Sequence, residues 1–336
     1  MSSRTSPEGE LLVGGQALIE GVMMRSPGAY GVAVRRADGS MAFQRGKVES
    51  LARRYPFLKL PVLRGVAVLF QSLALGIRAL NFSAEQAIEE DAREARKDAP
   101  PVAAIPEPEK APGKTSNWAI AGSMAFGLGM GVLIFIFLPL WLTQLAETYV
   151  FGQLSSLAFN LVDGLLRGVF FLAYITAIAQ MKDIHRVFQY HGAEHKVVFV
   201  HEKGLPLTVE NARGMSRLHP RCGTSFLLFV LVVSIVVFAF IPKTAPFLVK
   251  FGGRLLLVPA IAGLSYEVLR ITAKRRAAPL FALLVAPGLA LQRITTQEPT
   301  DDMLEVAIAA LETALREDGL LEEAPGAGAL PAAAGG

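Results

Sequence analysis

The sequence is poor in cysteine and in charge. Its 336 residues include one cysteine, Cys222, and only 18% are charged, whereas 52% are hydrophobic. A single cysteine excludes a disulfide within the chain and any metal site built from several cysteines of one copy. A soluble globular domain has about 25% charged residues, so this balance is unusual for one. The composition therefore predicts a membrane protein, with the lipid bilayer as its first partner.

Motifs for several kinds of chemistry are also missing. The sequence has no phosphate-binding glycine loop, serine nucleophile elbow or dinucleotide fingerprint, which argues against ATP-driven and redox-cofactor chemistry. No compact basic run is interleaved with aromatic residues, so the net charge of +4 does not indicate a nucleic-acid partner. The N-terminus is polar and contains Glu8 and Glu10, unlike a signal peptide. The sequence identifies no protein partner and no oligomeric state.

The N-terminal region, residues 11–90, begins with strand-like patterns. Short apolar runs occupy residues 11–13, 30–34 and 41–43. Asp38-Gly39 separates the last two runs and is typical of a hairpin turn. These patterns predict a small β module.

A helix and a linker follow the β module. Residues 60–88 have a helical pattern in which Arg64 and Arg78 lie among apolar side chains, which favours a helix in the membrane interface. Residues 91–114 are rich in proline, alanine, glutamate and lysine. Such a segment cannot bury a core, so it is predicted to be a flexible linker.

Residues 115–292 predict a membrane domain. A helix needs about 20 apolar residues to cross a bilayer. The segments that approach this length are residues 115–146, 161–181, 222–242 and 255–271. Asp163 and Arg167 lie four residues apart in the second segment, a spacing that favours a structural ion pair on one helix face. Residues 277–292 contain two prolines and predict a re-entrant or interfacial hairpin, with a fifth crossing as the alternative.

The positions of lysine and arginine predict the orientation, because short loops rich in these residues stay in the cytoplasm. Residues 147–160 contain neither residue type, whereas the His-rich loop 182–221 contains many. Both termini and this loop are therefore expected on the cytoplasmic side of the inner (plasma) membrane. Lys243, Lys250 and Arg254 oppose this topology, because they are placed in an external loop.

The predicted fold class is an α-helical integral membrane protein with about four transmembrane helices and a small N-terminal cytoplasmic β module. Residues 293–318 are expected to form a cytoplasmic helical segment at the C-terminal side. Residues 319–336 are rich in alanine, glycine and proline and are expected to be a disordered tail.

Histidine is concentrated in one short part of the chain. The five histidines are His185, His191, His195, His201 and His219, and Cys222 lies three residues after the last of them. Residues 191–195 have the pattern HxxEH, which on a helix places His191 and His195 on one face with Glu194 beside them. This arrangement predicts a divalent metal site, with zinc as the metal and Glu194 as the general base of a hydrolase.

A third metal ligand has three candidates. His219 and Cys222 form an HxxC pair before an apolar segment and suit a structural zinc site. Glu267 lies near the cytoplasmic end of the last predicted span and suits a catalytic site, although an acid at that depth needs a partner. The plain alternative is that the histidines bond lipid phosphates or backbone carbonyls and that Cys222 is a small buried apolar residue.

Residues 14–25, GGQALIEGVMMR, form a second conspicuous run. Its glycines permit close backbone approach, and Gln16, Glu20 and Arg25 supply polar groups among apolar neighbours. The favoured interpretation is a tight strand-turn-strand, and the alternative is a second wall of the metal site.

Several runs together resemble the YqhQ family of bacterial and plastid membrane proteins. These runs are residues 14–25, 190–196, 219–226, 295–299 and 302–305. The resemblance extends from Gly14 to about Leu311, except in the linker and the tail. It implies a membrane protein without an established reaction, and the family is described as predicted metal-dependent enzymes.

The sequence therefore predicts a multi-pass membrane protein that acts as a metal-dependent hydrolase with its HxxEH site at the cytoplasmic face. The alternative is a non-enzymatic transporter, channel or membrane assembly factor with a structural or regulatory metal site.

Overall fold

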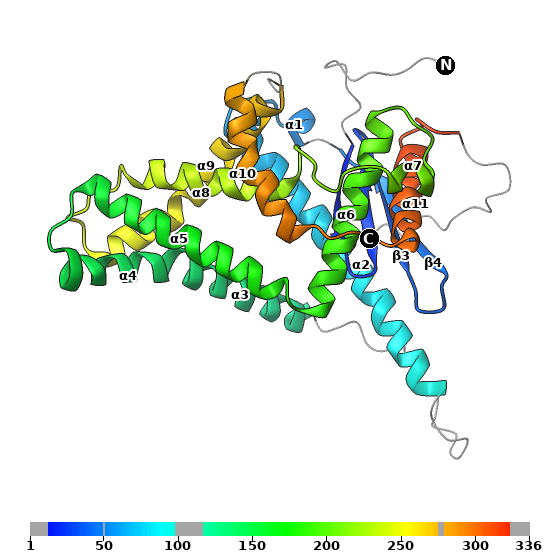
Figure 1. The fold of residues 1–336 in the computed structure, drawn as a ribbon, viewed down its shortest axis with the longest axis horizontal. Coiled ribbons are helices and arrows are strands. Elements are labelled where there is room, and N and C mark those ends of the chain that lie inside the picture. Colours follow the sequence, from blue (N-terminus) through cyan, green and yellow to red (C-terminus); the bar gives the residue numbers. More distant parts are fainter. Residues whose placement is uncertain (1–12, 50, 98–116, 275–278, 323–336) are drawn as a thin grey trace. The chain divides into compact units, whose positions relative to one another are not determined.

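The computed structural model describes residues 13–49, 51–97, 117–274 and 279–322, and it is mostly helical with one small sheet (Figure 1). The chain divides into two compact units. The first unit comprises the described residues of Met1–Arg93, Ile175–Phe229 and Ala262–Gly336. The second unit comprises those of Glu94–Tyr174 and Val230–Ile261.

The first unit contains the predicted β module as a four-stranded antiparallel sheet in the order β1-β2-β3-β4. The strands are β1 (Gly14–Leu18), β2 (Gly21–Arg25), β3 (Ala29–Arg35) and β4 (Met41–Lys47). The GGQALIEGVMMR run forms β1, a two-residue turn and β2, so the strand-turn-strand interpretation is confirmed. Leu11 and Leu12, expected in the first strand, lie outside the described residues.

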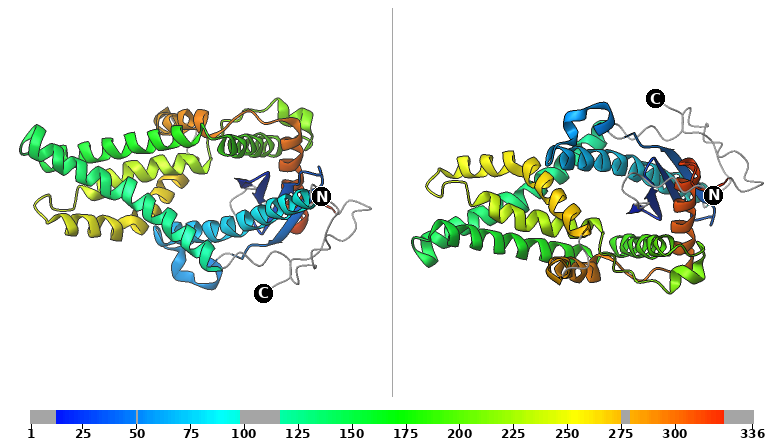
Figure 2. Two further views of the ribbon diagram at one scale, coloured as in Figure 1. Left: turned by 90° about the horizontal axis from the view of Figure 1, so that it is seen from below. Right: turned by 90° about the horizontal axis from the view of Figure 1, so that it is seen from above.

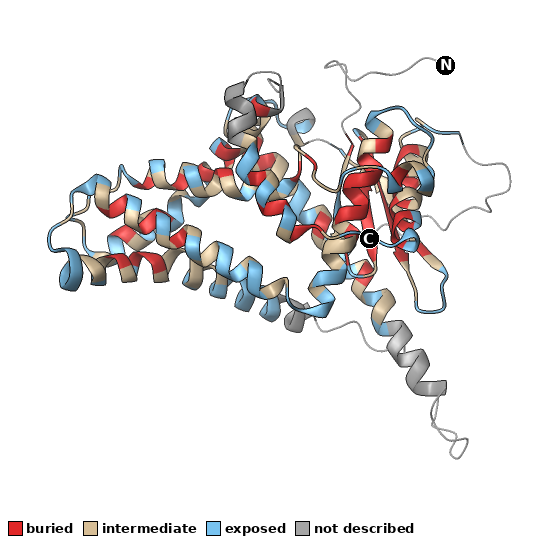
Figure 3. Cartoon of the chain, in the orientation of Figure 1, coloured by how far each residue is buried: buried red, intermediate tan, exposed pale blue. Residues whose placement is uncertain are grey.

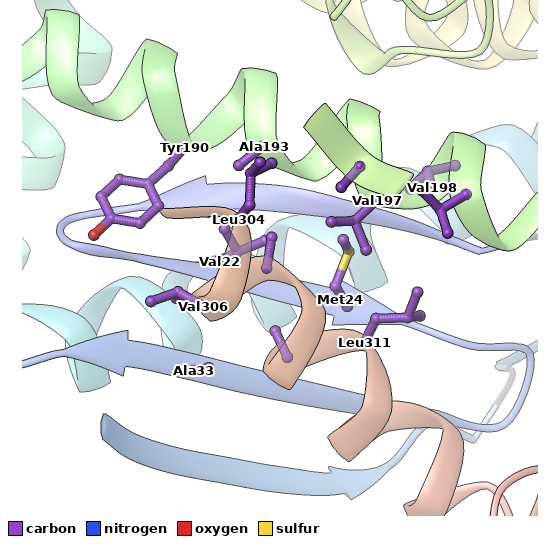
Figure 4. Close-up of a cluster of buried hydrophobic side chains, with 14 of the residues drawn as sticks. Val22, Met24, Ala33, Tyr190, Ala193, Val197, Val198, Leu304, Val306 and Leu311 are labelled. Atoms are coloured by element: carbon purple, nitrogen blue, oxygen red, sulfur yellow. The ribbon is translucent and has the colours of Figure 1, made fainter. Parts of the chain in front are cut away.

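One face of the sheet packs on two helices, α6 (Lys182–Glu202) and α11 (Asp301–Glu317). Side chains alternate between the two faces of a strand, so Val22 and Met24 point to the same side. Figure 4 shows these two residues in one cluster with Val197 of α6 and Leu311 of α11. This apolar layer fixes α6 against the sheet.

The other face of the sheet is covered by α2 (Leu63–Lys97). Met23 and Val32, which alternate with the residues of the first face, are buried together with Ala79 of α2. Both views in Figure 2 show the strands between α2 and α6. Helix α2 extends to Lys97, so the first residues of the expected linker are helical, and residues 98–116 lie outside the description.

The first unit also contains several further helices. They are α1 (Leu51–Arg54), the 3-10 helix η1 (Pro56–Lys59), α7 (Val209–Arg213), the start of α8 (Gly223–Phe238) and α10 (Pro279–Thr295). The predicted hairpin at residues 277–292 is wrong, because α10 runs through Pro287 without a break. A proline removes one hydrogen bond from a helix, but it bends a helix more readily than it reverses one.

The predicted His-rich loop is also largely helical, since α6 and α7 lie within residues 182–221. The charged residues of this segment suggested a loop, but α6 buries one side on the sheet. A helix with one apolar face and one polar face carries many charges without leaving the core.

The second unit is built from long apolar helices. One helical run comprises α3 (Asn117–Val132), the π-helix η2 (Leu133–Phe137), α4 (Leu138–Ala146) and the π-helix η3 (Glu147–Phe151). The unit also contains most of α5 (Ser156–Ile178), the end of α8 and the first half of α9 (Phe247–Lys274). Large apolar side chains are exposed here, including Phe126 at 73% and Leu256 at 81% (Figure 3). Lipid is a suitable solvent for such a surface.

The second unit also buries a cluster of ions. Arg167 donates to Asp163 at 2.7 Å and to Ser234 at 2.7 Å. Arg254 of α9 donates to the other oxygen of the Asp163 carboxylate at 2.5 Å. The predicted pair of Asp163 and Arg167 is therefore present, but the carboxylate bridges two arginines. Helix α9 begins at Phe247, so the placement of Lys250 and Arg254 in a loop was wrong.

Among the described residues, four helices are long and apolar enough to cross a membrane: Leu63–Ile88, Gly122–Phe151, Ser156–Ile178 and Phe247–Thr272. Three of them correspond to the predicted first, second and fourth spans. The predicted third span is the shorter apolar helix Gly223–Phe238. The remaining candidate, Leu63–Ile88, is part of α2, which the sequence predicted to lie in the membrane interface.

Candidate metal centre

Helix α6 carries His191, Glu194 and His195 on the side that faces a cavity of the first unit. Gly192 lets a second segment cross this helix closely, because a Cβ atom there would lie 2.1 Å from the carbonyl oxygen of Gln297. The amide of Gln297 donates to the carbonyl of Phe188 at 2.8 Å. The segment after α10 is thereby fixed on α6 beside the histidines.

The imidazole of His191 is oriented by this crossing segment. Its Nδ1 lies 2.8 Å from the carbonyl oxygen of Thr295. A carbonyl oxygen only accepts, so Nδ1 carries the proton and Nε2 keeps its lone pair. That Nε2 lies 3.1 Å from the sulfur of Cys222.

The imidazole of His195 is oriented in the same way. Its Nδ1–H donates to the carbonyl oxygen of Arg217 at 2.5 Å. Its Nε2 is buried and has no hydrogen-bond partner among the described residues. Metal-binding histidines commonly donate one ring N–H to a carbonyl and coordinate through the other nitrogen. Both histidines meet this requirement.

Cys222 lies directly before α8, and its side chain is buried. The sulfur lies 3.2 Å from the hydroxyl of Thr224, and the amide of Thr224 donates to it at 3.4 Å. The backbone of His219, three residues before Cys222, is held by the side chain of Gln292 in α10. This side chain accepts from the amide of His219 at 2.7 Å and donates to its carbonyl at 2.8 Å.

His191, His195 and Cys222 bring one ligand atom each to within 4.8 Å of one another. Zinc–nitrogen bonds of about 2.1 Å and a zinc–sulfur bond of about 2.3 Å in a tetrahedron separate the ligand atoms by roughly 3.5 Å. The donor set of two imidazoles and one sulfur matches zinc in softness and in number, and it leaves a fourth position open.

Glu194 lies beside this group and is also tied to β1. One carboxylate oxygen accepts the amide N–H of Gly15 at 2.8 Å, and the other lies 3.9 Å from Nε2 of His191. A Cβ atom on Gly15 would lie 2.9 Å from Cγ of Glu194, so glycine permits this approach. The GGQALIEGVMMR run is therefore both a strand-turn-strand and a wall of the site.

The other predicted ligands, His219 and Glu267, have partners outside the three-residue group. His219 lines the cavity, but its Nδ1 accepts from the amide of Arg221 and its Nε2 lies 3.2 Å from Glu202. Glu267 has the partner that its position required, since Arg64 donates to it at 2.6 Å. His201 is half-buried, and burial lowers the pKa of its imidazole.

The cavity has a volume of about 440 Å³. Its lining includes residues 13–17, His191, Glu194, His195 and residues 221–224. Val187, Phe188 and Val198 of α6 add apolar side chains to the lining, and His219 adds a further polar one. A concave pocket in which apolar and polar side chains converge is the usual form of a ligand site.

Sequence reasoning missed the groups that orient the ligands. The carbonyls of Thr295 and Arg217 and the amide of Gly15 belong to the backbone, which has no signature of its own in a sequence. Their only signal was the presence of residues 14–25 and 295–299 among the runs that resemble the YqhQ family.

Comparison with known proteins gives a family but no reaction. Residues 60–317 match the family described as "Protein of unknown function (DUF1385)". The chain is also 37% identical over 317 residues to "Uncharacterized protein YqhQ" of Bacillus subtilis (strain 168), covering 92% of this chain and 94% of that protein. No solved structure matches. The chain therefore belongs to this YqhQ-like family.

Proposed function

We propose that this member of the YqhQ-like family is a membrane-embedded, zinc-dependent hydrolase. His191, His195 and Cys222 are the metal ligands, and Glu194 is the general base. The proposal selects Cys222 over His219 and Glu267 as the third ligand, because of these three candidates it is the one whose ligand atom lies within 4.8 Å of those of both histidines.

One observation carries the proposal. Nε2 of His195 is buried without a partner among the described residues, while its Nδ1 is fixed by a carbonyl. Leaving a buried polar atom unsatisfied costs about 1–3 kcal/mol. A metal ion bound at that nitrogen removes this cost and explains the orientation of both rings.

The site has the parts that hydrolysis needs. A zinc ion in a site with three protein ligands lowers the pKa of water and polarises a carbonyl. Glu194 is 6% exposed and is held by Gly15 at the edge of the same cavity. From there its free oxygen accepts a proton from water and returns it to a leaving group.

We also propose that the second unit lies in the inner (plasma) membrane of the cell and that both termini are cytoplasmic. Its exposed apolar helices and the excess of lysine and arginine around α6 support this topology. Helix α2 is placed in the membrane interface, because Ala79 packs on the sheet. Lys243 is a basic residue on the external side of this topology, and its charge is paired with Glu147 at 2.5 Å.

Elemental analysis of the full chain, purified in detergent, tests the metal site. The wild type is expected to contain zinc, and His195→Ala and Cys222→Ser are expected to lose it, because two remaining ligands rarely hold a divalent ion. His185→Ala is the matched control, since His185 is an exposed histidine on the same helix. Full zinc content in both ligand variants would exclude the proposed site.

Glu194→Gln separates the enzyme from a transporter, channel or assembly factor with a structural metal. If Glu194 is the base, this variant keeps zinc and loses hydrolysis. If the carboxylate only orients the ligands, zinc affinity falls by about 10–100 fold. A variant that keeps both zinc and cellular function would support the non-enzymatic alternative.

A further inference from the structure

Strand β1 lies at the edge of the sheet, and it borders the candidate metal cavity. The strand order places β2 on one side of β1, and within the described residues no strand lies on the other side. Residues 14–17 line the cavity, and Gly15 and Gln16 are exposed. An edge strand presents backbone N–H and C=O groups that another extended chain can pair with.

The directions of these groups follow from one observed bond. Gly15 donates its N–H to Glu194, so the backbone of Gly15 points away from β2. The direction alternates along an antiparallel strand, so the N–H and C=O of Ala17 point to the same free edge. Ala17 and Gly15 are two residues apart, a distance of about 7 Å along the strand.

We propose that the substrate is an extended polypeptide segment that pairs with the free edge of β1. This inference rests on the proposed function and names its substrate class. The N–H and C=O of Ala17 hold one substrate residue. The peptide bond two residues further along then lies opposite Gly15, beside Glu194 and the three metal ligands. Main-chain pairing of this kind binds peptides through their backbone and selects alternate side chains through pockets.

The charges of the cavity favour a neutral substrate over a phosphate ester. Arg221 lines the cavity, but its guanidinium pairs with Glu202. Among the described lining residues there is no lysine to receive a phosphate. The apolar side chains of Val187, Phe188 and Val198 suit small or medium apolar side chains of a peptide. A phosphorylated lipid or metabolite would have the proposed metal ion as a counter-charge but no lysine among these lining residues.

The reaction is a peptide-bond hydrolysis and needs no co-reactant except water. The oxygen of water forms a bond with the carbonyl carbon, and the C–N bond of the peptide breaks. Glu194 takes a proton from the water and passes it to the leaving amine. The second proton of the water also goes to the amine, so the products are a carboxylate and a protonated amine, and nothing is oxidised or reduced.

A degenerate octapeptide library tests the substrate class. The zinc-loaded full chain in detergent is incubated with the library, and products are identified by mass spectrometry. The wild type is expected to cleave peptides, and Glu194→Gln is not. A zinc-loaded wild type that leaves the whole library intact would overturn this inference while the metal site stands. A wild type without zinc would instead overturn the proposed function itself.

Variants of Ala17 test the pairing with β1. Ala17→Pro removes the outward N–H and keeps the ladder bonds to β2, which are made by neighbouring residues. It is expected to keep zinc and to lower kcat/KM for a cleaved peptide about tenfold, the effect of one lost hydrogen bond. Ala17→Ser keeps the N–H and is the matched control. Wild-type kcat/KM in a folded Ala17→Pro protein would exclude pairing at this edge.

A series of N-methylated peptides decides the question if Ala17→Pro does not fold. A single methyl group is placed on each backbone nitrogen of one cleaved peptide in turn. Pairing with a strand predicts that cleavage by the wild type is lost at every second position, because alternate N–H groups face β1. Equal loss at all positions, or at none, would overturn the pairing.

Discussion

The two units each bury a cluster of polar side chains, and only the cluster of the second unit pairs opposite charges. In the second unit, the carboxylate of Asp163 bridges Arg167 and Arg254, and both guanidinium groups also lie about 5 Å from the ring of Phe238. In the first unit, His191, His195 and Cys222 direct their ligand atoms at one another. Nothing among the described residues bonds Nε2 of His195.

This difference separates a structural cluster from a functional one. In the second unit opposite charges pair with each other, although Nε of Arg254 also lacks a hydrogen-bond partner among the described residues, so removing one member should mainly affect folding. In the first unit Nε2 of His191 and the sulfur of Cys222 contact each other, so Nε2 of His195 is the atom that a cation from outside would satisfy. We therefore expect the second unit to respond to mutation through stability and the first unit through metal content.

Asp163→Asn should have the largest effect on stability. It leaves Arg167 and Arg254 buried without their carboxylate, and breaking a buried pair in this way costs about 3–5 kcal/mol. Unfolding of the detergent-solubilised protein with denaturant measures the loss. Leu165→Ala is the control, because Leu165 is 71% exposed in the same helix. Equal stability of Asp163→Asn and wild type would show that the cluster does not stabilise the unit.

Zinc should stabilise the first unit selectively. A ligand at a concentration 1,000 times its Kd stabilises the state that binds it by about 4 kcal/mol. Hydrogen exchange with and without a chelator should therefore show protection in α6 and around Cys222. The core of α5 in the second unit should be unaffected. Equal protection of both units would indicate a general effect of zinc on the chain instead of a site.

Gly192→Ala should lower both stability and zinc affinity. The new Cβ would meet the carbonyl oxygen of Gln297 at 2.1 Å, so the segment that holds His191 through Thr295 must move. Overpacking of this kind costs about 1–3 kcal/mol. Gly214→Ala is the control, since its nearest contact would be 3.9 Å away. Thermal unfolding and zinc titration measure the two effects, and a variant with normal zinc affinity would show that Thr295 is not needed to orient the ring.

The spacing of residues predicted the part of the site that lies on one helix. HxxEH placed His191, Glu194 and His195 together because four residues make about one helical turn. The choice of the third ligand among His219, Cys222 and Glu267 depended on tertiary contacts, and the spacing of residues along the sequence does not predict these. Glu267 illustrates this limit: its partner Arg64 lies 203 residues earlier in the chain.

The fold shows the same limit for charged residues. The pattern of apolar residues predicted the apolar helices and the small sheet. It placed Lys250 and Arg254 outside a helix, although both lie within α9. Arg254 was placed in a loop before the predicted span that begins at Leu255, whereas in the structure it lies within α9 and pairs with Asp163, 91 residues earlier. The two prolines of α10 were interpreted as a hairpin because the sequence alone does not show whether neighbours support a bent helix.

Thr224→Val should have the smallest effect, and it tests whether the sulfur of Cys222 is a ligand. The Thr224 hydroxyl lies 3.2 Å from the sulfur, and a donor there stabilises the negative charge of a metal-bound sulfur. Removing a group that contacts a ligand weakens metal binding by about tenfold at the low end. Thr224→Ser restores the hydroxyl and should restore affinity, whereas valine keeps the size of threonine. Competition with a zinc chelator measures the difference. Equal zinc affinity in Thr224→Val and Thr224→Ser would mean that Cys222 does not bind the metal, and the unpartnered nitrogen of His195 would then need another explanation.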